Sequence, residues 1–410
     1  MKEKTNKPQH IYFDNSATTP MDPRVISEMD KVMRNTFGNP SSIHSYGREA
    51  RALLDKCREI CRDFIGADET DEIIFTSGGS EADNLAILGL VQNPSGPVAK
   101  IKKPHIITST IEHKAVLETI KELEKRELIE ATYLKVDKYG QINVEDVKRE
   151  IKYNTVLISV MYVNNEVGTI QPIKEIGKHL EKINPARVGG GFSRVYLHTD
   201  AVQAFPYLKC DVKHLHVDMM SVSAHKFNGP KGVGFLYIKE GTPVGKMIYG
   251  GAQEGNYRAG TENLAGIAGL AKAVEILNKE QDKEAKKLIN LRDRLIKGVL
   301  KIKGSQLTGH KTERSPAIAS FVFEAIEGES ILINLDLEGI AVSTGSACTS
   351  GTLSPSHVLT AMGFTQQEAQ GNIRVSLGRF NTGKEVEHFL KVLPGIIERL
   401  REMSPLESQM

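Results

Sequence analysis

The sequence has few cysteines, no excess of charge of either sign and no long apolar stretch. Its 410 residues include four cysteines, Cys57, Cys61, Cys210 and Cys348, too few for a disulfide framework in a chain of this length. The 53 basic and 51 acidic residues are interspersed, which argues against a polyanion-binding surface and predicts no nucleic-acid partner. No segment reaches the roughly 18 apolar residues that a membrane-spanning helix needs, so we expect no membrane association.

The remaining composition is that of an ordinary globular protein. The first ten residues are polar and lack the apolar segment of a signal peptide, so we expect a cytoplasmic protein with reduced thiols. Cys57 and Cys61 lie four residues apart, a spacing that could suggest a metal site. However, both continue a helical pattern of apolar residues, and a free cysteine behaves as a small core hydrophobe. We therefore expect both thiols in a hydrophobic core.

Strand-like and helical segments alternate through the first two thirds of the chain. Strands are expected at residues 72–76, 105–109, 155–162, 195–200, 218–223 and 234–238. This alternation predicts an α/β fold, in which a mostly parallel sheet is covered by helices on both faces. After Thr261, a long helical stretch precedes shorter strands, which predicts a smaller α+β domain. We expect a large domain over residues 16–265 and a small domain formed by residues 1–15 and 266–410.

Lys226 follows one of the predicted strands, in the sequence Ser223-Ala224-His225-Lys226. A desolvated lysine amine can form a Schiff base with a carbonyl compound. A solvated charge at the end of a strand is the other ordinary interpretation, and this segment alone does not decide between them.

Polar groups follow four other predicted strands. The Gly/Ser turn of residues 76–84 leads into a helix whose N–H groups could bind a phosphate, or it is a simple capped turn. His113 and Asn165 follow two further strands, and Asp200 ends a fourth, where a carboxylate could hold a protonated pyridine nitrogen or cap a helix. Because residues beyond the carboxyl ends of parallel strands face one crevice, these groups and Lys226 together indicate one active site.

Two further residues suggest chemistry in the smaller domain. Cys348 lies in a stretch, residues 342–355, that is nearly free of large side chains and is typical of an exposed loop. Its thiol is either an incidental free cysteine or a nucleophile, and we favour the nucleophile. Arg374 carries a guanidinium suited to a carboxylate ligand, although an arginine that emerges from a strand often makes a structural ion pair.

The order of these motifs resembles that of the pyridoxal-phosphate (PLP)-dependent cysteine desulfurases, which have the fold type I of PLP-dependent transferases. The similar segments cover most of the chain: residues 12–20, 37–42, 76–84, 112–114, 165–168, 198–203, 223–226, 258–261, 345–350 and 374–379. Residues 345–350 resemble the group with the longer active-site loop. The resemblance implies an enzyme that converts L-cysteine to L-alanine and transfers the sulfur to an enzyme cysteine, for iron–sulfur cluster assembly or another sulfur-transfer pathway. A selenocysteine lyase or another PLP-dependent transferase is the alternative.

The resemblance also implies a role for each matching residue around the cofactor. Lys226 would bind PLP covalently, Asp200 would pair with its pyridine nitrogen and Gln203 with its ring hydroxyl. His113 would stack on the ring and carry protons. The phosphate would be held by four residues of this chain and one of a second subunit, which implies a homodimer: Gly79, Ser80, Ser223, His225 and Thr261.

The remaining implied roles concern the substrate and the sulfur. Asn165, beside the cofactor, and Arg374 would bind the carboxylate of L-cysteine. Cys348 would take the sulfur and, as a transient metal ligand, could contact an iron–sulfur centre. The partner would be an iron–sulfur scaffold or another sulfur-acceptor protein. Relative to the family pattern, the segment Lys182–Arg194 is longer, and we interpret it as a surface loop.

Overall fold

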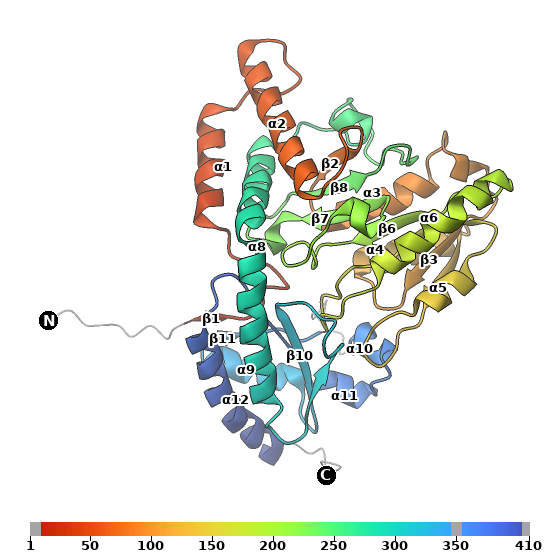
Figure 1. The fold of residues 1–410 in the computed structure, drawn as a ribbon. Helices are drawn as coiled ribbons and strands as arrows, with labels where there is room; N and C mark the ends of the chain where they lie inside the picture. The colour runs from red at the N-terminus through yellow and green to blue at the C-terminus, as the bar shows by residue number, and fades with distance from the viewer. Residues whose placement is uncertain (1–9, 346–354, 404–410) are drawn as a thin grey trace.

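The computed structural model describes residues 10–345 and 355–403, and its centre is a seven-stranded sheet (Figure 1). The strand order is β2 (Glu72–Thr76), β8 (Gly234–Ile238), β7 (Met219–Ser223), β6 (Tyr196–Asp200), β5 (Thr155–Ser159), β3 (His105–Ser109) and β4 (Glu130–Leu134). Only β8 is antiparallel to its two neighbours, so the other six strands all run in one direction. The predicted mostly parallel α/β sheet is confirmed.

Helices cover both faces of this sheet because successive strand residues point to opposite sides. On one face, strand residues such as Leu197 pack with helices α2 (Ser45–Phe64), α5 (Val144–Glu150), α6 (Ile173–Gly189) and α7 (Val212–Leu215). On the other face, Tyr196 and its neighbours pack with α3 (Gly79–Val91) and α4 (Lys114–Lys125). Cys57 and Cys61 lie buried in the first of these cores, which confirms their predicted packing role.

The segment Lys182–Arg194 is not the surface loop that the sequence suggested. Helix α6 continues through Lys182 to Gly189, with Pro185 inside it, and only the residues after Gly189 connect it to β6. The return is fixed by Asn184, whose side chain makes hydrogen bonds of 3.0 and 2.9 Å to the backbone of Val195. The glycines therefore end a helix instead of forming a long loop.

A second, smaller sheet lies beside the first. Its antiparallel strands are ordered β12 (Asn372–Ser376), β10 (Ile318–Phe323) and β9 (Ser305–Thr308), and β1 (Ile11–Tyr12) pairs with β11 (Ile340–Ala341). Helices α9 (Gly328–Leu337) and α12 (Gly383–Met403) pack on it and form a separate core. Short helices α10 (His357–Ala361) and α11 (Gln366–Gln370) complete this part.

The long helix α8 (Leu264–Val299) connects the two cores and runs from one part of the molecule to the other (Figure 1). Its residues up to Leu277 belong to the core of the large sheet, whereas Leu288, Leu295 and Val299 belong to the smaller core. The two cores agree with a large and a smaller part, but α8 stays in the large core up to Leu277, and the boundary at residue 265 stays a prediction. No helix in the described part of the chain is both long and apolar enough to cross a bilayer.

A buried ion-pair network ties the two parts together. The Arg379 guanidinium, whose side chain is 9% exposed, contacts Asp22 at 2.7 Å, Glu284 at 2.5 Å and Glu280 at 3.5 Å. Asp22 also caps helix α1 (Pro23–Asn35) by accepting a hydrogen bond from the Arg24 N–H. Arg379 thus forms structural ion pairs that join the smaller sheet to the N-terminal segment and to α8.

We expect Arg379→Ala to lower the free energy of unfolding by about 3 kcal/mol, because the nearly buried Glu284 carboxylate loses its arginine partner. Asp22 and Glu280 keep their ion pairs with Arg24. The urea midpoints of the variant and the unchanged protein measure this difference. Arg34→Ala is the matched control: Arg34 pairs with Asp30 on the exposed face of α1, so its midpoint should not change. An unchanged midpoint for Arg379→Ala would contradict a stabilising role for the network.

Candidate active site

The strand ends singled out in the sequence meet at one edge of the large sheet. Asp200 is the last residue of β6, and Lys226 ends the short helix η2 (Ala224–Lys226) directly after β7. His113 precedes α4 beyond β3, Asn165 follows β5, and Gly79 begins α3 beyond β2. Because all five strands run in the same direction, their carboxyl ends form a common rim.

Lys226 lies at the centre of this rim, with its side chain turned toward the N-terminal segment. Its Nζ donates hydrogen bonds to the carbonyl oxygens of Ser16 at 2.6 Å and Ala17 at 2.8 Å. Burial, and then the charge of Arg374, lower the pKa of Lys226 to about 8, although Asp200 opposes the shift. A considerable fraction of the amine is therefore neutral, and nucleophilic, near neutral pH.

Asp200 and His113 flank the lysine. Asp200 is buried and accepts a hydrogen bond of 2.9 Å from the N–H of Val202. Burial raises the pKa of Asp200, whereas the nearby His113 and Lys226 lower it. The His113 ring is exposed at the rim and caps α4 through Nδ1, yet desolvation by the surrounding protein lowers its pKa. The rim thus holds one carboxylate and a neutral imidazole beside the amine.

Helix α3 begins at the same rim without a side-chain cap. A Cβ at Gly79 would lie 2.9 Å from Cγ2 of Val202 and 3.6 Å from Cβ of Ser223, so a side chain here would require Val202 to shift. Ser80 is exposed in the first turn of α3. An uncapped helix start with a glycine at the point of closest approach suits a phosphate group.

His225 and Gln203 are held by the N-terminal segment. Nδ1 of His225 lies 3.1 Å from the hydroxyl of Thr18, and burial and Lys226 lower the pKa of His225 to about 4. The Gln203 amide donates to the carbonyl of Ser16 at 2.9 Å, the same oxygen that Lys226 contacts. The segment between β1 and Pro20 therefore forms one wall of the site. The sequence analysis gave these residues no role in the site, although their small polar side chains could have indicated one.

Arg374 joins the smaller sheet to this rim. Its guanidinium donates to Asp14 at 2.8 Å and to the backbone carbonyl of Asn165 at 3.0 Å. Its Nε is buried and makes no hydrogen bond within the described residues. The structure thus brings Arg374 and Asn165 together, and the guanidinium keeps a donor for an anionic ligand.

Two buried acids behind Asp200 were also missed by sequence reasoning. Burial raises the pKa of Glu112 to about 8 and that of Asp83 well above its usual value, and Asp200 raises both further. The nearby His198 is kept neutral by burial, which lowers its pKa, and is bonded to two serine hydroxyls at 2.9 Å. Burial therefore favours the protonated form of both acids behind Asp200.

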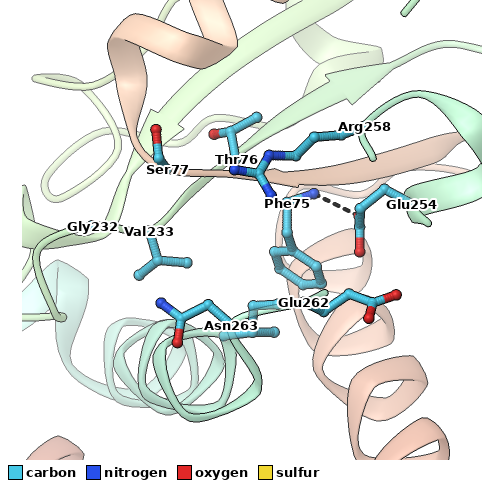
Figure 2. Close-up of a pocket in the computed structure, with 10 residues that line it drawn as sticks. Phe75, Thr76, Ser77, Gly232, Val233, Glu254, Arg258, Glu262 and Asn263 are labelled. Atoms are coloured by element: carbon cyan, nitrogen blue, oxygen red, sulfur yellow. Dashed lines mark hydrogen bonds between the residues drawn. The ribbon is translucent and has the colours of Figure 1, made fainter. Parts of the chain in front are cut away.

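Thr261 is exposed on the segment between the short helix η3 (Glu254–Asn256) and α8, and no contact joins it to Lys226 of its own chain. The pocket beside this segment (Figure 2) is lined by Glu254 and Arg258, which have partners, and by Glu262, whose Oε2 is buried and makes no hydrogen bond within the described residues. Glu254 accepts from the N–H of Phe75 at 2.8 Å, and Arg258 contacts Glu81 at 2.5 Å. These bonds hold the segment against the end of β2 and so position Thr261, whose role toward a second subunit stays a prediction.

Cys348 lies outside the described residues, and its predicted roles as sulfur acceptor and transient metal ligand stay predictions. Within residues 10–345 and 355–403, no three His, Cys, Asp or Glu side chains are placed to hold a metal ion. The three other cysteines are free and buried.

Comparisons with known proteins agree with the geometry. The family model of the class-V aminotransferases matches residues 11–389. The cysteine desulfurase IscS of Methanosarcina thermophila is 47% identical over 396 residues, which cover 97% of this chain and 94% of that protein. A solved NifS-like protein is 38% identical to this chain, with a TM-score of 0.86. The match covers 96% of this chain and 100% of the NifS-like chain.

A second solved structure, SspA in complex with cysteine, is 34% identical to this chain, with a TM-score of 0.77. The match covers 91% of this chain and 100% of the SspA chain. These findings confirm the resemblance inferred from the motifs and the fold type I architecture. The chain belongs to the class-V aminotransferase family and, within it, to the cysteine desulfurases.

Proposed function

We propose that this enzyme binds PLP at the carboxyl edge of the large sheet and uses it to convert L-cysteine to L-alanine, with transfer of the sulfur to Cys348. The observation that carries the proposal is the Lys226 amine, whose pKa is lowered to about 8, in one cluster with Asp200, His113 and Arg374. An aminotransferase without sulfur chemistry would need the lysine and the aspartate but no loop cysteine.

The residues present fit the cofactor. The uncapped start of α3 suits the phosphate, with Ser223 and His225 beside it. The buried Asp200 carboxylate suits a protonated pyridine nitrogen, Gln203 the ring hydroxyl and Lys226 the aldehyde. When bound, PLP supplies an electron sink that stabilises negative charge on the α-carbon of the substrate.

The side chains of this enzyme then do the remaining work. Arg374 and Asn165 bind the substrate carboxylate and fix the α-carbon beside Lys226 and His113, which are neutral enough to accept a proton. The Cys348 thiolate attacks the substrate sulfur: a sulfur–sulfur bond forms, the carbon–sulfur bond breaks, and the carbon takes up a proton. The products are L-alanine and a Cys348 persulfide.

Further parts of the proposal concern partners and location. The solved relative SspA binds cysteine, which supports L-cysteine as the substrate, and selenocysteine is the alternative. We propose that an iron–sulfur scaffold protein receives the sulfur and that Thr261 reaches the phosphate site of a second copy in a homodimer. The free thiols of Cys57, Cys61 and Cys210 support action in the reducing cytoplasm.

We expect Lys226→Ala to abolish the visible absorption band of the lysine-bound cofactor, because the variant lacks the amine that lies at the centre of the rim. A spectrum of the purified protein with added PLP measures this band. Lys231→Ala, which removes an exposed lysine nearby, is the control and keeps the band. An unchanged band in Lys226→Ala would remove this lysine from the proposal.

The lowered pKa of Lys226 predicts how cofactor uptake depends on pH. Only the neutral amine attacks an aldehyde, and its fraction rises as the pH passes through the pKa. We expect the rate of PLP uptake by cofactor-free protein to rise with pH and level off, with a midpoint at about 8. The growth of the visible band after mixing measures the rate, with N-acetyl-lysine as reference. A midpoint near the ordinary value of 10.5 would show that the amine is not desolvated.

We expect Cys348→Ser to retain the cofactor band but to reduce sulfide release from L-cysteine by at least about a hundredfold, because a hydroxyl does not take the sulfur. Sulfide and alanine assays with a thiol reductant measure the loss. Cys57→Ala, which removes a buried core thiol, should leave the release nearly unchanged. Full release by Cys348→Ser would favour the selenocysteine lyase alternative, which the same assay tests with selenocysteine.

A further inference from the structure

Glu166 lies close to described residues near both ends of the segment that contains Cys348. Before it, Gly345 donates its N–H to Asn372 at 2.8 Å, and a Cβ at Gly345 would lie 2.7 Å from Oε2 of Glu166. After it, the buried Ser356 donates its hydroxyl to that same Oε2 in a short hydrogen bond. Glu166 therefore accepts a hydrogen bond at the downstream end and lies close to Gly345 at the upstream end.

Helix α10 attaches the downstream end firmly to the large domain. His357 bonds through Nε2 to the carbonyl of Glu112 at 3.0 Å, directly before His113 in the chain. Beneath it, Val358, Leu359 and Met362 of the helix pack with apolar residues of the loops after β3 and β5 in a small separate core, among them Ile111, Met161 and Val167. The downstream end is thus fixed to the loops that carry His113 and Asn165.

The same support reaches the arginine proposed to bind the substrate carboxylate. Asn165, next to Glu166, accepts a hydrogen bond from Arg374 through its carbonyl. Asn372, which binds the N–H of Gly345, lies two residues before Arg374 on β12 and therefore on the same face of the strand. Asn165 and Glu166 thus connect Arg374 to both ends of the Cys348 segment.

Burial makes Glu166 costly unless it is bonded. Its side chain is 6% exposed, and burial raises its pKa to about 7 against the opposing effects of Ser356 and Arg374. A buried carboxyl group needs hydrogen-bond donors, and the Ser356 hydroxyl is the donor in contact with it. Such a pair holds its two elements in one arrangement more strictly than apolar packing alone.

We propose that Glu166 and Ser356 form a positioning pair, whose hydrogen bond fixes the end of the Cys348 segment next to Arg374 and so sets how Cys348 meets the substrate sulfur. The inference rests on the proposed function, in which Arg374 binds the carboxylate and Cys348 takes the sulfur. The pair touches no reacting atom, and it acts by placing the groups that do.

The test compares Ser356→Ala and Glu166→Leu, each of which removes one partner, in the full-length protein with cofactor. We expect each to lower kcat for alanine formation about tenfold with little change in KM and an unchanged cofactor band, because misplaced groups lose the transition-state geometry. Ser356→Thr and Glu166→Gln, which keep a donor and an acceptor, should restore most of kcat. The double variant should lose no more than either single one, because the two residues act as a unit.

Controls separate the pair from a mere helix cap. Ser356 also caps α10 by accepting from the N–H of Leu359 at 3.3 Å, a bond that Glu166→Leu leaves intact. Thr360→Ala removes another hydroxyl bond of α10, to the carbonyl of Ser356, and should leave kcat unchanged. An effect of Ser356→Ala without one of Glu166→Leu, no rescue by threonine, or fully additive losses would each overturn the proposal.

A second readout needs no catalysis. Burial raises the pKa of the Cys57, Cys61 and Cys210 thiols, so iodoacetamide modifies Cys348 selectively. We expect Ser356→Ala and Glu166→Leu to change the modification rate of Cys348, followed by mass spectrometry, at least about threefold, because the end of its segment is released. Equal rates in all variants would overturn the pair. If the wild-type protein forms no alanine from cysteine, the proposed function is refuted instead. The modification rate of Cys348 would then still test whether Glu166 and Ser356 fix the end of its segment.

Discussion

The burial of charged groups at the carboxyl edge of the large sheet is the constraint on which the site depends. Lys226, Asp200 and Arg374 are all withdrawn from water, and each ionised group there needs an opposite charge or a hydrogen-bond donor or acceptor. The carbonyl oxygens of Ser16 and Ala17 satisfy the lysine, and Asp14 compensates the arginine. The chemistry of the rim follows from this incomplete compensation, because it leaves the Lys226 amine partly neutral beside the buried carboxyl group of Asp200.

The direction of the strands turns sequence order into a site. Six of the seven strands run the same way, so groups separated by more than a hundred residues, such as Gly79 and Lys226, emerge at one edge. The reversed strand β8 supplies no functional side chain to the site, but its backbone packs closely against the turn before α3. A Cβ at Gly234 would lie 2.9 Å from Cα of Gly78. Strand β8 therefore presses the start of α3 toward the lysine, and only glycine permits that approach.

The sequence predicted what local patterns encode. Strand periodicity and the polar residue after each strand were enough to place Lys226, Asp200 and His113 on one rim. The partners of these residues were missed because they come from distant segments: Asp14 and Ser16 precede the first large-sheet strand, and Asp83 and Glu112 lie on the far side of Asp200. The loop predicted for Lys182–Arg194 was wrong because its glycines end α6, and the Asn184 bonds to Val195 that fix this return are invisible in a local pattern. The roles predicted for Cys348 rest on its sequence motif alone.

The division of chemistry between the two cores explains why their junction is so polar. The large sheet holds the proposed cofactor groups, whereas the smaller part supplies Arg374 and the ends of the Cys348 segment. A reaction that uses groups from both parts needs them in fixed register, and apolar contacts alone would allow sliding. Arg379 with Asp22, Arg374 with Asp14, and Ser356 with Glu166 are directional bonds across that junction, spaced from the middle of α8 to the rim. Directional bonds at several points fix rotation as well as distance, so the junction itself is part of the catalytic geometry.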